Sequence, residues 1–250
     1  DTFAEPKPIL GMLHLGGATA EDRLTQALEE SRIMAGAGID GLVVENYFGD
    51  ADDVERVLDR LLALNLGPRV GINVLRDNAR AFALARSYPV AFLQIDSVCG
   101  HLPPEADQGF AQDLAAQRAA VAALLFGGVR FKYQAVLSGR SEDEDVRLGA
   151  ARCDALVVTS DATGQETDSA KILRFRATTG GRTPLLIGAG MTEANVGPKL
   201  ALADGAIVGS WFKEDHVDKG RMVAAHVEGF MAAVRRARAG LQDPNRPLGS

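Results

Sequence analysis

Two stretches near the C-terminal end decide the fold, Leu186-Ile-Gly-Ala-Gly-Met-Thr192 and Ala203-Asp-Gly-Ala-Ile-Val-Gly-Ser210. Each contains a short apolar run that ends at a glycine. A short apolar run bounded by turn residues is typical of a strand that is buried on both faces. Such strands belong to parallel sheets that helices cover, so the two stretches predict the last strands of an α/β fold.

The same alternation of apolar run and helical pattern extends toward the N-terminus. Helical patterns cover residues 19–37, 51–65, 78–87, 108–126, 168–179, 193–202 and 217–239, and the acidic stretch 141–145 predicts the cap of another short helix. The predicted strands are residues 8–14, 41–46, 69–75, 90–96, 129–136, 154–160, 184–188 and 205–209.

Eight such units predict a single (β/α)8 TIM barrel over residues 1–250, the usual length of that fold. The alternative is an open doubly wound sheet, but no GxGxxG motif follows the first strand. In a barrel every strand-to-helix loop lies at the C-terminal end of the strands, so functional groups are expected to gather there.

Composition narrows the classes of partner. The net charge is -6, and the one basic cluster, Arg235, Arg236 and Arg238, is typical of a solvated helix end, so no nucleic-acid surface is expected. Cys99 and Cys153 are too far apart for a CxxC motif, which favours a reducing compartment without disulfides. No apolar run approaches a membrane span and no signal peptide is visible, so we expect a cytoplasmic protein.

The two glycine-rich strand ends predict a phosphate site made of Gly188, Ala189, Gly190, Gly209 and Ser210. Glycines let backbone N–H groups approach an anion closely, and helices starting near Thr192 or after Ser210 would direct positive dipole ends toward it. The alternative is that these glycines only form turns. Lys213 lies just beyond, either neutralising the anion or pointing into solvent.

Polar residues end several other predicted strands and form the candidate reaction site. Glu45 and Asp96 could share acid and base work, pair structurally with cations, or hold a divalent metal. His14 is either a proton-transfer group or a hydrogen-bonded wall residue. Lys132, placed inside the fifth strand, would act as a cation or nucleophile if it points inward. The candidate substrate-binding residues are Asn46, Asn73, Arg76, Asp161 and Thr163.

These segments resemble the BtpA family, also called the BtpA/SgcQ family. The similar stretches are Gly11-Met-Leu-His-Leu15, Asp40-Gly-Leu-Val-Val-Glu-Asn46, Gly71-Ile-Asn-Val-Leu-Arg76, Ala162-Thr-Gly164 and the two glycine-rich strand ends. The resemblance implies a phosphate-binding TIM barrel related to phosphoribosylanthranilate isomerase. It also implies either a sugar-metabolism enzyme or a factor for accumulation of photosystem I proteins.

The chain departs from the usual family pattern in three places at the mouth. These are Gln94 where arginine is common, Tyr133-Gln134 after Lys132 where a histidine is usual, and Ser160-Asp161 in place of threonine and glycine. The substrate or reaction is therefore expected to differ from that of typical members.

Two functions follow as hypotheses. The first is an enzyme acting on a phosphorylated sugar or a phosphoribosyl or nucleotide-like compound, by isomerisation, cleavage or ribosyl transfer. Glu45 or Asp96 would be its general base, and Lys132 would stabilise negative charge. The second is a non-catalytic assembly or regulatory factor that retains the phosphate-binding barrel. In either case the partner is a phosphorylated small molecule, and a homo-oligomer is an open possibility; no cofactor is identified.

Overall fold

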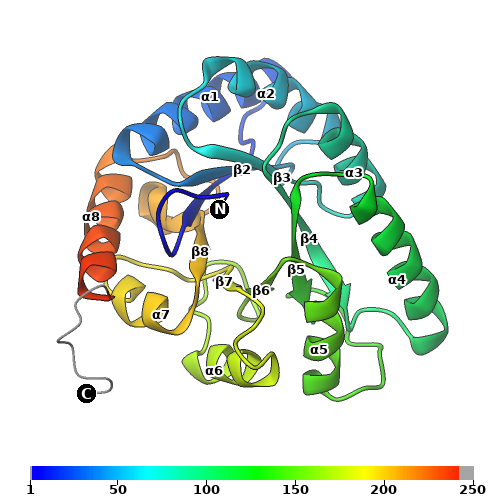
Figure 1. Ribbon diagram of the computed structural model, residues 1–250. Helices are drawn as coiled ribbons and strands as arrows, with labels where there is room; N and C mark the ends of the chain where they lie inside the picture. The colour runs from blue at the N-terminus through cyan, green and yellow to red at the C-terminus, as the bar shows by residue number, and fades with distance from the viewer. Residues whose placement is uncertain (1, 242–250) are drawn as a thin grey trace.

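The computed structural model describes residues 2–241 and shows a ring of parallel strands surrounded by helices (Figure 1). The strands are β1 (Ile9–Leu13), β2 (Gly41–Glu45), β3 (Arg69–Asn73), β4 (Phe92–Cys99), β5 (Leu124–Val129), β6 (Ala155–Val158), β7 (Leu185–Ile187) and β8 (Gly205–Val208). Neighbours in the ring follow chain order, and β1 pairs with β8, which closes the barrel. The predicted TIM barrel is confirmed.

The helices lie outside this ring and alternate with the strands. They are α1 (Ala20–Ala37), α2 (Ala51–Leu64), α3 (Asn78–Ser87), α4 (Pro104–Ala119), α5 (Glu142–Arg152), α6 (Ser169–Thr178), α7 (Val196–Leu202) and α8 (Ala224–Leu241). As predicted, Thr19 caps α1 and Ser141 caps α5, each accepting a hydrogen bond from the backbone three residues on. No helix within residues 2–241 combines the length and the apolar composition that crossing a bilayer requires.

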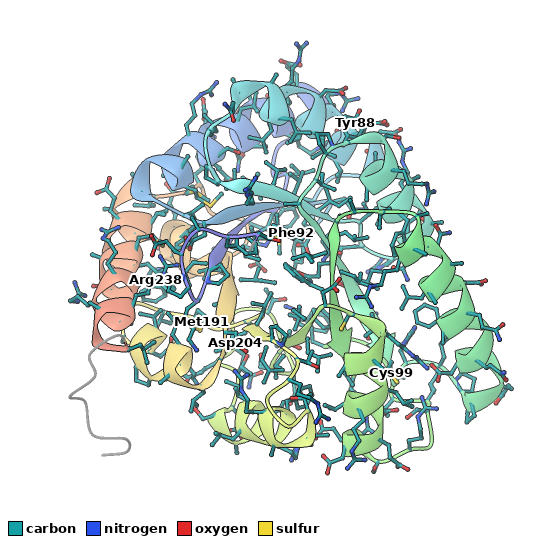
Figure 2. All side chains as sticks on the ribbon, viewed as in Figure 1. Tyr88, Phe92, Cys99, Met191, Asp204 and Arg238 are labelled. Carbon is teal, nitrogen blue, oxygen red and sulfur yellow. The ribbon has the colours of Figure 1, made fainter. Side chains whose placement is uncertain are left out.

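Strand side chains alternate between the barrel interior and the helices. In β1, Leu10 and Met12 belong to the inner apolar cluster, whereas Leu13 packs with the helices. Phe92, which lies inside the ring in Figure 2, stacks on Phe126 with 4.9 Å between ring centroids. The interior is therefore filled by side chains, as expected of a TIM barrel.

The position of β5 corrects the prediction. The strand runs from Leu124 to Val129 and not over residues 129–136. Gly127 and Gly128 resemble a helix-ending turn in the sequence, but they lie inside the strand because neighbours fill the space of their missing side chains. A Cβ on Gly127 would lie 2.6 Å from Val98, and one on Gly128 would lie 2.0 Å from the carbonyl oxygen of Asp96. These contacts come from a distant part of the chain, so local patterns do not reveal them.

Several helix boundaries also differ from the prediction. Helix α4 runs from Pro104 to Ala119 rather than over residues 108–126, because a proline is well suited to a first helical turn. Helix α7 begins at Val196 rather than near Thr192. Residues 210–216 form two short 3-10 turns, η1 (Ser210–Phe212) and η2 (Glu214–His216), and α8 begins only at Ala224.

Candidate functional site

A cavity of about 370 Å³ opens at the C-terminal ends of the strands. This is the face where TIM barrels place their active sites, and the volume suits a small ligand. All predicted site residues line it except Asn46, Asn73 and Asp161. Those that do are His14, Glu45, Arg76, Asp96, Lys132, Thr163, Gly188, Ala189, Gly190, Gly209 and Ser210.

The three exceptions lie elsewhere for different reasons. Asn46 accepts a hydrogen bond from the backbone N–H of Leu75 at 2.7 Å and so ties the ends of β2 and β3 together. Asn73 is buried beneath the cavity and contacts its carboxyl groups. Asp161 is exposed and outside the cavity.

Glu45 and Asp96 share one amide. The Nδ2 group of Asn73 donates to Glu45 Oε1 at 2.8 Å and to Asp96 Oδ1 at 3.3 Å. Burial, together with the charge of Asp96, raises the pKa of Glu45 to about 8, although Lys132 and the Asn73 hydrogen bond oppose this. Burial also raises the pKa of Asp96, against the effects of Asn73, Lys132 and Arg76. Glu45 is therefore a carboxylic acid at neutral pH.

His14 follows β1 and is 4% exposed. Its Nε2 lies 3.8 Å from Glu45 Oε2, and its ring lies 4.9 Å from that of Tyr47. Burial, followed by the positive charge of Lys213, lowers the pKa of His14 to about 3, so the imidazole is neutral at physiological pH. Its Nδ1 atom has no hydrogen-bond partner within residues 2–241.

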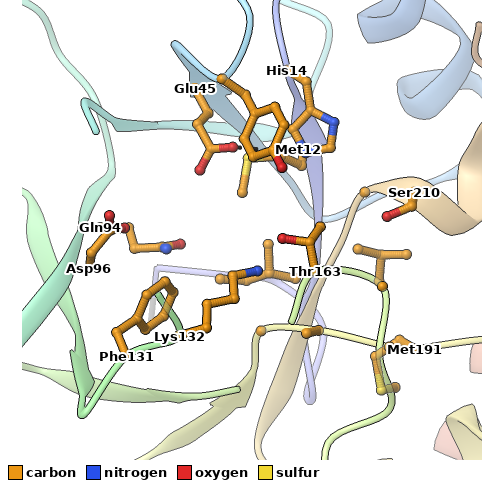
Figure 3. A pocket seen from close by; sticks show the side chains of 18 of the residues that line it. Met12, His14, Glu45, Gln94, Asp96, Phe131, Lys132, Thr163, Met191 and Ser210 are labelled. Atoms are coloured by element: carbon orange, nitrogen blue, oxygen red, sulfur yellow. Dashed lines mark ion pairs between the residues drawn. The ribbon is translucent and has the colours of Figure 1, made fainter. Parts of the chain in front are cut away.

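Lys132 reaches the cavity from the loop after β5 and not from within the strand, which corrects the prediction. Its neighbours differ from each other, because Phe131 belongs to the inner apolar cluster whereas Tyr133 is 74% exposed. This is not the regular alternation expected if residues 131–133 lay within a strand. Figure 3 shows Lys132 extending between the carboxyl side of the cavity, with Glu45 and Asp96, and the side that carries Ser210.

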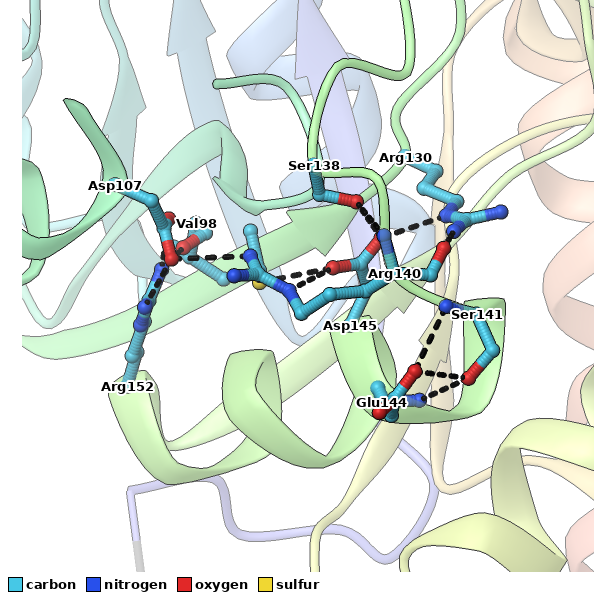
Figure 4. Close-up of polar contacts among 10 residues, drawn as sticks. Val98, Asp107, Arg130, Ser138, Arg140, Ser141, Glu144, Asp145 and Arg152 are labelled. Carbon is cyan, nitrogen blue, oxygen red and sulfur yellow. Dashed lines mark hydrogen bonds and ion pairs between the residues drawn. The ribbon is translucent and has the colours of Figure 1, made fainter. Parts of the chain in front are cut away.

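A buried ionic network holds the loop that carries Lys132 (Figure 4). Asp145, in the first turn of α5, accepts hydrogen bonds from Arg130 and Arg140 at 2.8 Å and from Ser138 at 2.7 Å. Arg140 also donates to Asp107 at 3.0 Å, which connects the loop to α4. Although burial opposes it, these hydrogen bonds lower the pKa of Asp145. The network therefore fixes both ends of the loop by charged, buried contacts.

The two glycine bends line the same cavity, as the predicted phosphate site requires. Within the described chain, the N–H groups of Ala189, Gly190 and Met191 donate to no protein acceptor. Close packing also requires glycine at two of these positions. Gly190 has a φ of 69°, and a Cβ there would lie 2.2 Å from the carbonyl oxygen of Gln165, while one on Gly209 would lie 2.8 Å from the His14 ring. The late start of α7 removes the helix dipole predicted near Thr192, whereas η1 does start at Ser210.

Lys213 is neither a surface residue nor a group lining the cavity. Its side chain is 1% exposed, and its Nζ lies 3.6 Å from Glu30 Oε1 in α1. Gln26 donates to the same Glu30 oxygen at 2.9 Å. The buried ammonium acts on the site through its charge, because it helps to keep His14 neutral. Arg238 also differs from the prediction, since it is buried and pairs with Asp40 at 2.5 Å.

The structure adds residues that sequence reasoning did not place in the site. Tyr47, Trp211 and His216 line the cavity, and the Trp211 and His216 rings stack 3.9 Å apart with an interplanar angle of 4°. Gln94, which the sequence already placed at the mouth, lines the cavity too, and its Oε1 atom has no partner within residues 2–241. The sequence did contain one sign that Trp211 belongs to the site, because this only tryptophan of the chain directly follows Ser210 of the predicted phosphate site.

The described part of the chain contains no cluster of side chains suited to binding a metal ion. Residues 2–241 contain no group of three or more histidine, cysteine, aspartate or glutamate side chains placed to hold an ion. The oxygen atoms of Glu45 and Asp96 are bridged by Asn73 instead.

The chain is similar in sequence and in fold to several known proteins. A photosystem I biogenesis protein BtpA from Synechocystis sp. is 28% identical over 242 residues, covering 85% of this chain and 82% of that protein. Among solved structures, phosphoribosyl anthranilate isomerase from Thermus thermophilus has a TM-score of 0.62 at 14% identity, covering 92% and 98% of the two chains.

Thiamine phosphate pyrophosphorylase from Pyrococcus furiosus has a TM-score of 0.59 at 13% identity, covering 92% of this chain and 96% of that one. At these identities the two solved structures support the fold alone. The BtpA family itself matches residues 5–236. This chain therefore belongs to the BtpA family.

Proposed function

We propose that this protein is an enzyme that carries out acid–base chemistry on a phosphorylated sugar or a phosphoribosyl compound. One observation carries the proposal: the glycine bends at Gly188–Gly190 and Gly209–Ser210 open into the same cavity as Glu45, Asp96 and Lys132. A phosphate held at one side would fix the reacting carbons at the other, because binding energy from a remote group positions the reacting atoms.

The two carboxyl groups have different electrostatic surroundings, which suits separate acid and base roles. Glu45, with a pKa near 8, holds a proton at neutral pH and is the general acid of the proposal. Arg76 and Lys132 both favour the carboxylate of Asp96, whereas only Lys132 of these two acts in the same way on Glu45, so Asp96 is the general base of the proposal. Lys132 stabilises the negative charge that develops on a sugar oxygen.

Two of the structural neighbours, by their names, concern phosphorylated compounds, phosphoribosyl anthranilate and thiamine phosphate. Their chains share only the fold with this one, so they support the proposal as analogy. The departures from the usual BtpA pattern at Gln94, Tyr133 and Gln134 lie on the cavity wall and are expected to set a substrate different from that of typical BtpA members.

A ligand screen followed by turnover assays tests the proposal. Melting temperatures are measured with ribose 5-phosphate, other phosphosugars and nucleotides, each beside its unphosphorylated form. Phosphorylated compounds should raise the melting temperature, because a ligand that binds only the native state stabilises it. Compounds that bind are then assayed for isomerisation and cleavage with the wild-type protein and with Glu45→Gln and Asp96→Asn.

The expected result is binding by all three proteins and turnover by the wild type alone. Ser210→Ala should weaken the binding of phosphorylated compounds and leave that of the unphosphorylated forms unchanged. If no phosphorylated compound binds better than its unphosphorylated form, the proposal is wrong.

A second candidate is a binding role without catalysis, as in a biogenesis factor. The relative from Synechocystis sp. carries that description, and apolar side chains are exposed in the Lys132 loop, where Tyr133, Val136 and Leu137 are 74%, 50% and 51% exposed. Exposed apolar clusters often mark protein contacts. Ligand binding with no turnover in any assay would favour this candidate.

A further inference from the structure

Residues 213–223 connect the bend Gly209–Ser210, called the anion bend below, to α8, and His216 of this segment lines the cavity. Its ends are fixed: Lys213 is buried against Glu30, and Lys213 and Met222 form an antiparallel bridge. Its middle is exposed at residues 214–217 and is held by local contacts, such as the hydrogen bond from the His216 N–H to the Lys213 carbonyl oxygen at 3.1 Å. Asp215 and His216 have φ values of 51° and 56° there. Consecutive left-handed residues other than glycine are energetically costly, so this conformation depends on contacts that hold it.

Two of those contacts come from a single carboxylate, that of Asp218. The Ser210 hydroxyl donates to Asp218 Oδ1 at 2.7 Å, and the Tyr47 hydroxyl donates to Oδ2 at 3.3 Å. Ser210 belongs to the predicted phosphate site, and Tyr47 lies against His14. The segment therefore places a negative group of the chain itself on a donor that a phosphate would use.

The charge of Asp218 also reaches the reacting side of the cavity. Burial and Asp96 are the main causes of the raised pKa of Glu45, and Asp218 adds to them. Asp218 likewise opposes the lowering of the pKa of His14 that burial and Lys213 produce. A phosphate dianion on Ser210 would thus lie beside a carboxylate in a partly buried site, where repulsion between like charges is weakly screened.

We propose that Asp218 is an internal occupant of the anion bend, which a phosphorylated ligand displaces as the segment 213–223 swings away from Ser210 and Tyr47. Asp218 then determines specificity, because the protein binds a dianion only at the cost of breaking this contact and separating the two charges. The inference rests on the proposed function, since it concerns the same phosphate site.

Trp211 provides a reporter for the movement. It is the only tryptophan of the chain, its ring stacks on that of His216 in the same segment, and its carbonyl oxygen lies 2.9 Å from His216 Nδ1. Displacement of the segment removes the imidazole from the indole face. The tryptophan emission must then change in intensity or wavelength.

The experiment compares Asp218→Asn with Asp215→Asn. Both changes remove one negative charge from the same segment, and asparagine tolerates the left-handed conformation at position 215. Affinities for inorganic phosphate and ribose 5-phosphate are measured by calorimetry, with ribose as the uncharged probe. Asp218→Asn is expected to bind both phosphates about tenfold more tightly than the wild type does, with Asp215→Asn close to the wild type and ribose unaffected.

The outcomes separate the two proposals. Equal or weaker phosphate binding by Asp218→Asn, relative to Asp215→Asn, overturns the role of Asp218 while leaving the phosphate site intact. If neither the wild type nor Asp218→Asn binds a phosphate, the proposed function fails, and the contact of Asp218 with Ser210 and Tyr47 is tested by tryptophan emission alone. Asp218→Asn should then change the Trp211 spectrum and Asp215→Asn should not; identical spectra would overturn the inference.

Discussion

Nε2 of His14 lies 3.8 Å from Oε2 of Glu45, and both side chains are predominantly neutral at pH 7. The pair is therefore a contact between an imidazole and a carboxylic acid, not an ion pair. Burial keeps both groups uncharged, because the cavity wall solvates neither charged form well. Each member of the pair makes the stability of the protein depend on pH in a different range.

Glu45→Gln should stabilise the protein at high pH. In the unfolded chain Glu45 loses its proton near 4.5, whereas the folded protein retains it up to about 8. Between these values the folded state binds the extra proton, so the wild type loses stability as pH rises. Glutamine mimics the neutral acid and removes this loss, on the order of 5 kcal/mol above pH 8. Denaturant unfolding of both proteins at pH 5 and pH 8.5 measures the difference.

Glu228→Gln, at an exposed position of α8, is the matched control and should behave like the wild type at both pH values. A constant difference in unfolding free energy between Glu45→Gln and the wild type would show that Glu45 titrates normally.

His14 should remain neutral across the range in which free histidine titrates. Its folded-state pKa of about 3 lies below the ordinary 6.5, so the unfolded chain takes up a proton first as pH falls. The contribution of His14 to stability is therefore present above pH 6.5 and is lost between 6.5 and 3. Nuclear magnetic resonance of the imidazole nitrogens, assigned with His14→Gln, should show no titration between pH 5 and 8. A midpoint near 6.5 would contradict the burial argument.

Asp145→Asn should destabilise the protein by about 3–5 kcal/mol, because it leaves Arg130 and Arg140 partly buried without their shared carboxylate. Asp143→Asn removes another acidic residue from the first turn of α5 and should cost less than about 1 kcal/mol. Urea unfolding measures both. Similar losses in the two variants would mean that the helix dipole, not the network, accounts for the effect.

Gly190→Ala should destabilise the protein by at least about 2 kcal/mol, since a Cβ at this position meets the backbone of Gln165 and Glu166 and the residue has a positive φ. Gly36→Ala is the control. Gly36 lies inside α1 with nothing within 4 Å of the added carbon, so alanine should stabilise the protein by about 0.5–1 kcal/mol. Thermal unfolding distinguishes the two, and equal midpoints would contradict the close packing at Gly190.

The barrel was predictable because most of its strands coincide with short apolar runs in the sequence. The first strand, expected at residues 8–14, is Ile9–Leu13, and similar agreement holds for the second and third. The fifth strand was not predictable in the same way. Gly127 and Gly128 suggest a turn, and only the packing of Val98 and Asp96 from β4 explains why they extend.

In the candidate site, too, some features could be predicted from the sequence and others could not. Strand order alone brings Glu45, Asp96 and the glycine bends to one end of the barrel, so their proximity was predictable. The burial of Lys213 was not, because it depends on Glu30 in α1. Nor was the position of Asp218, which follows from the path of a loop without any periodic pattern.

Closure of the ring by β1 and β8 has a consequence for how the protein is made. Strand β1 leaves the ribosome before every other strand of the barrel, yet the partner on one of its sides, Gly205–Val208, is the last strand of the barrel to be synthesised. Until then a nascent chain presents an open strand edge that can pair with other nascent chains. Closure of the barrel therefore waits for the synthesis of β8, and slow synthesis of the residues between β1 and β8 prolongs the interval in which aggregation competes with folding.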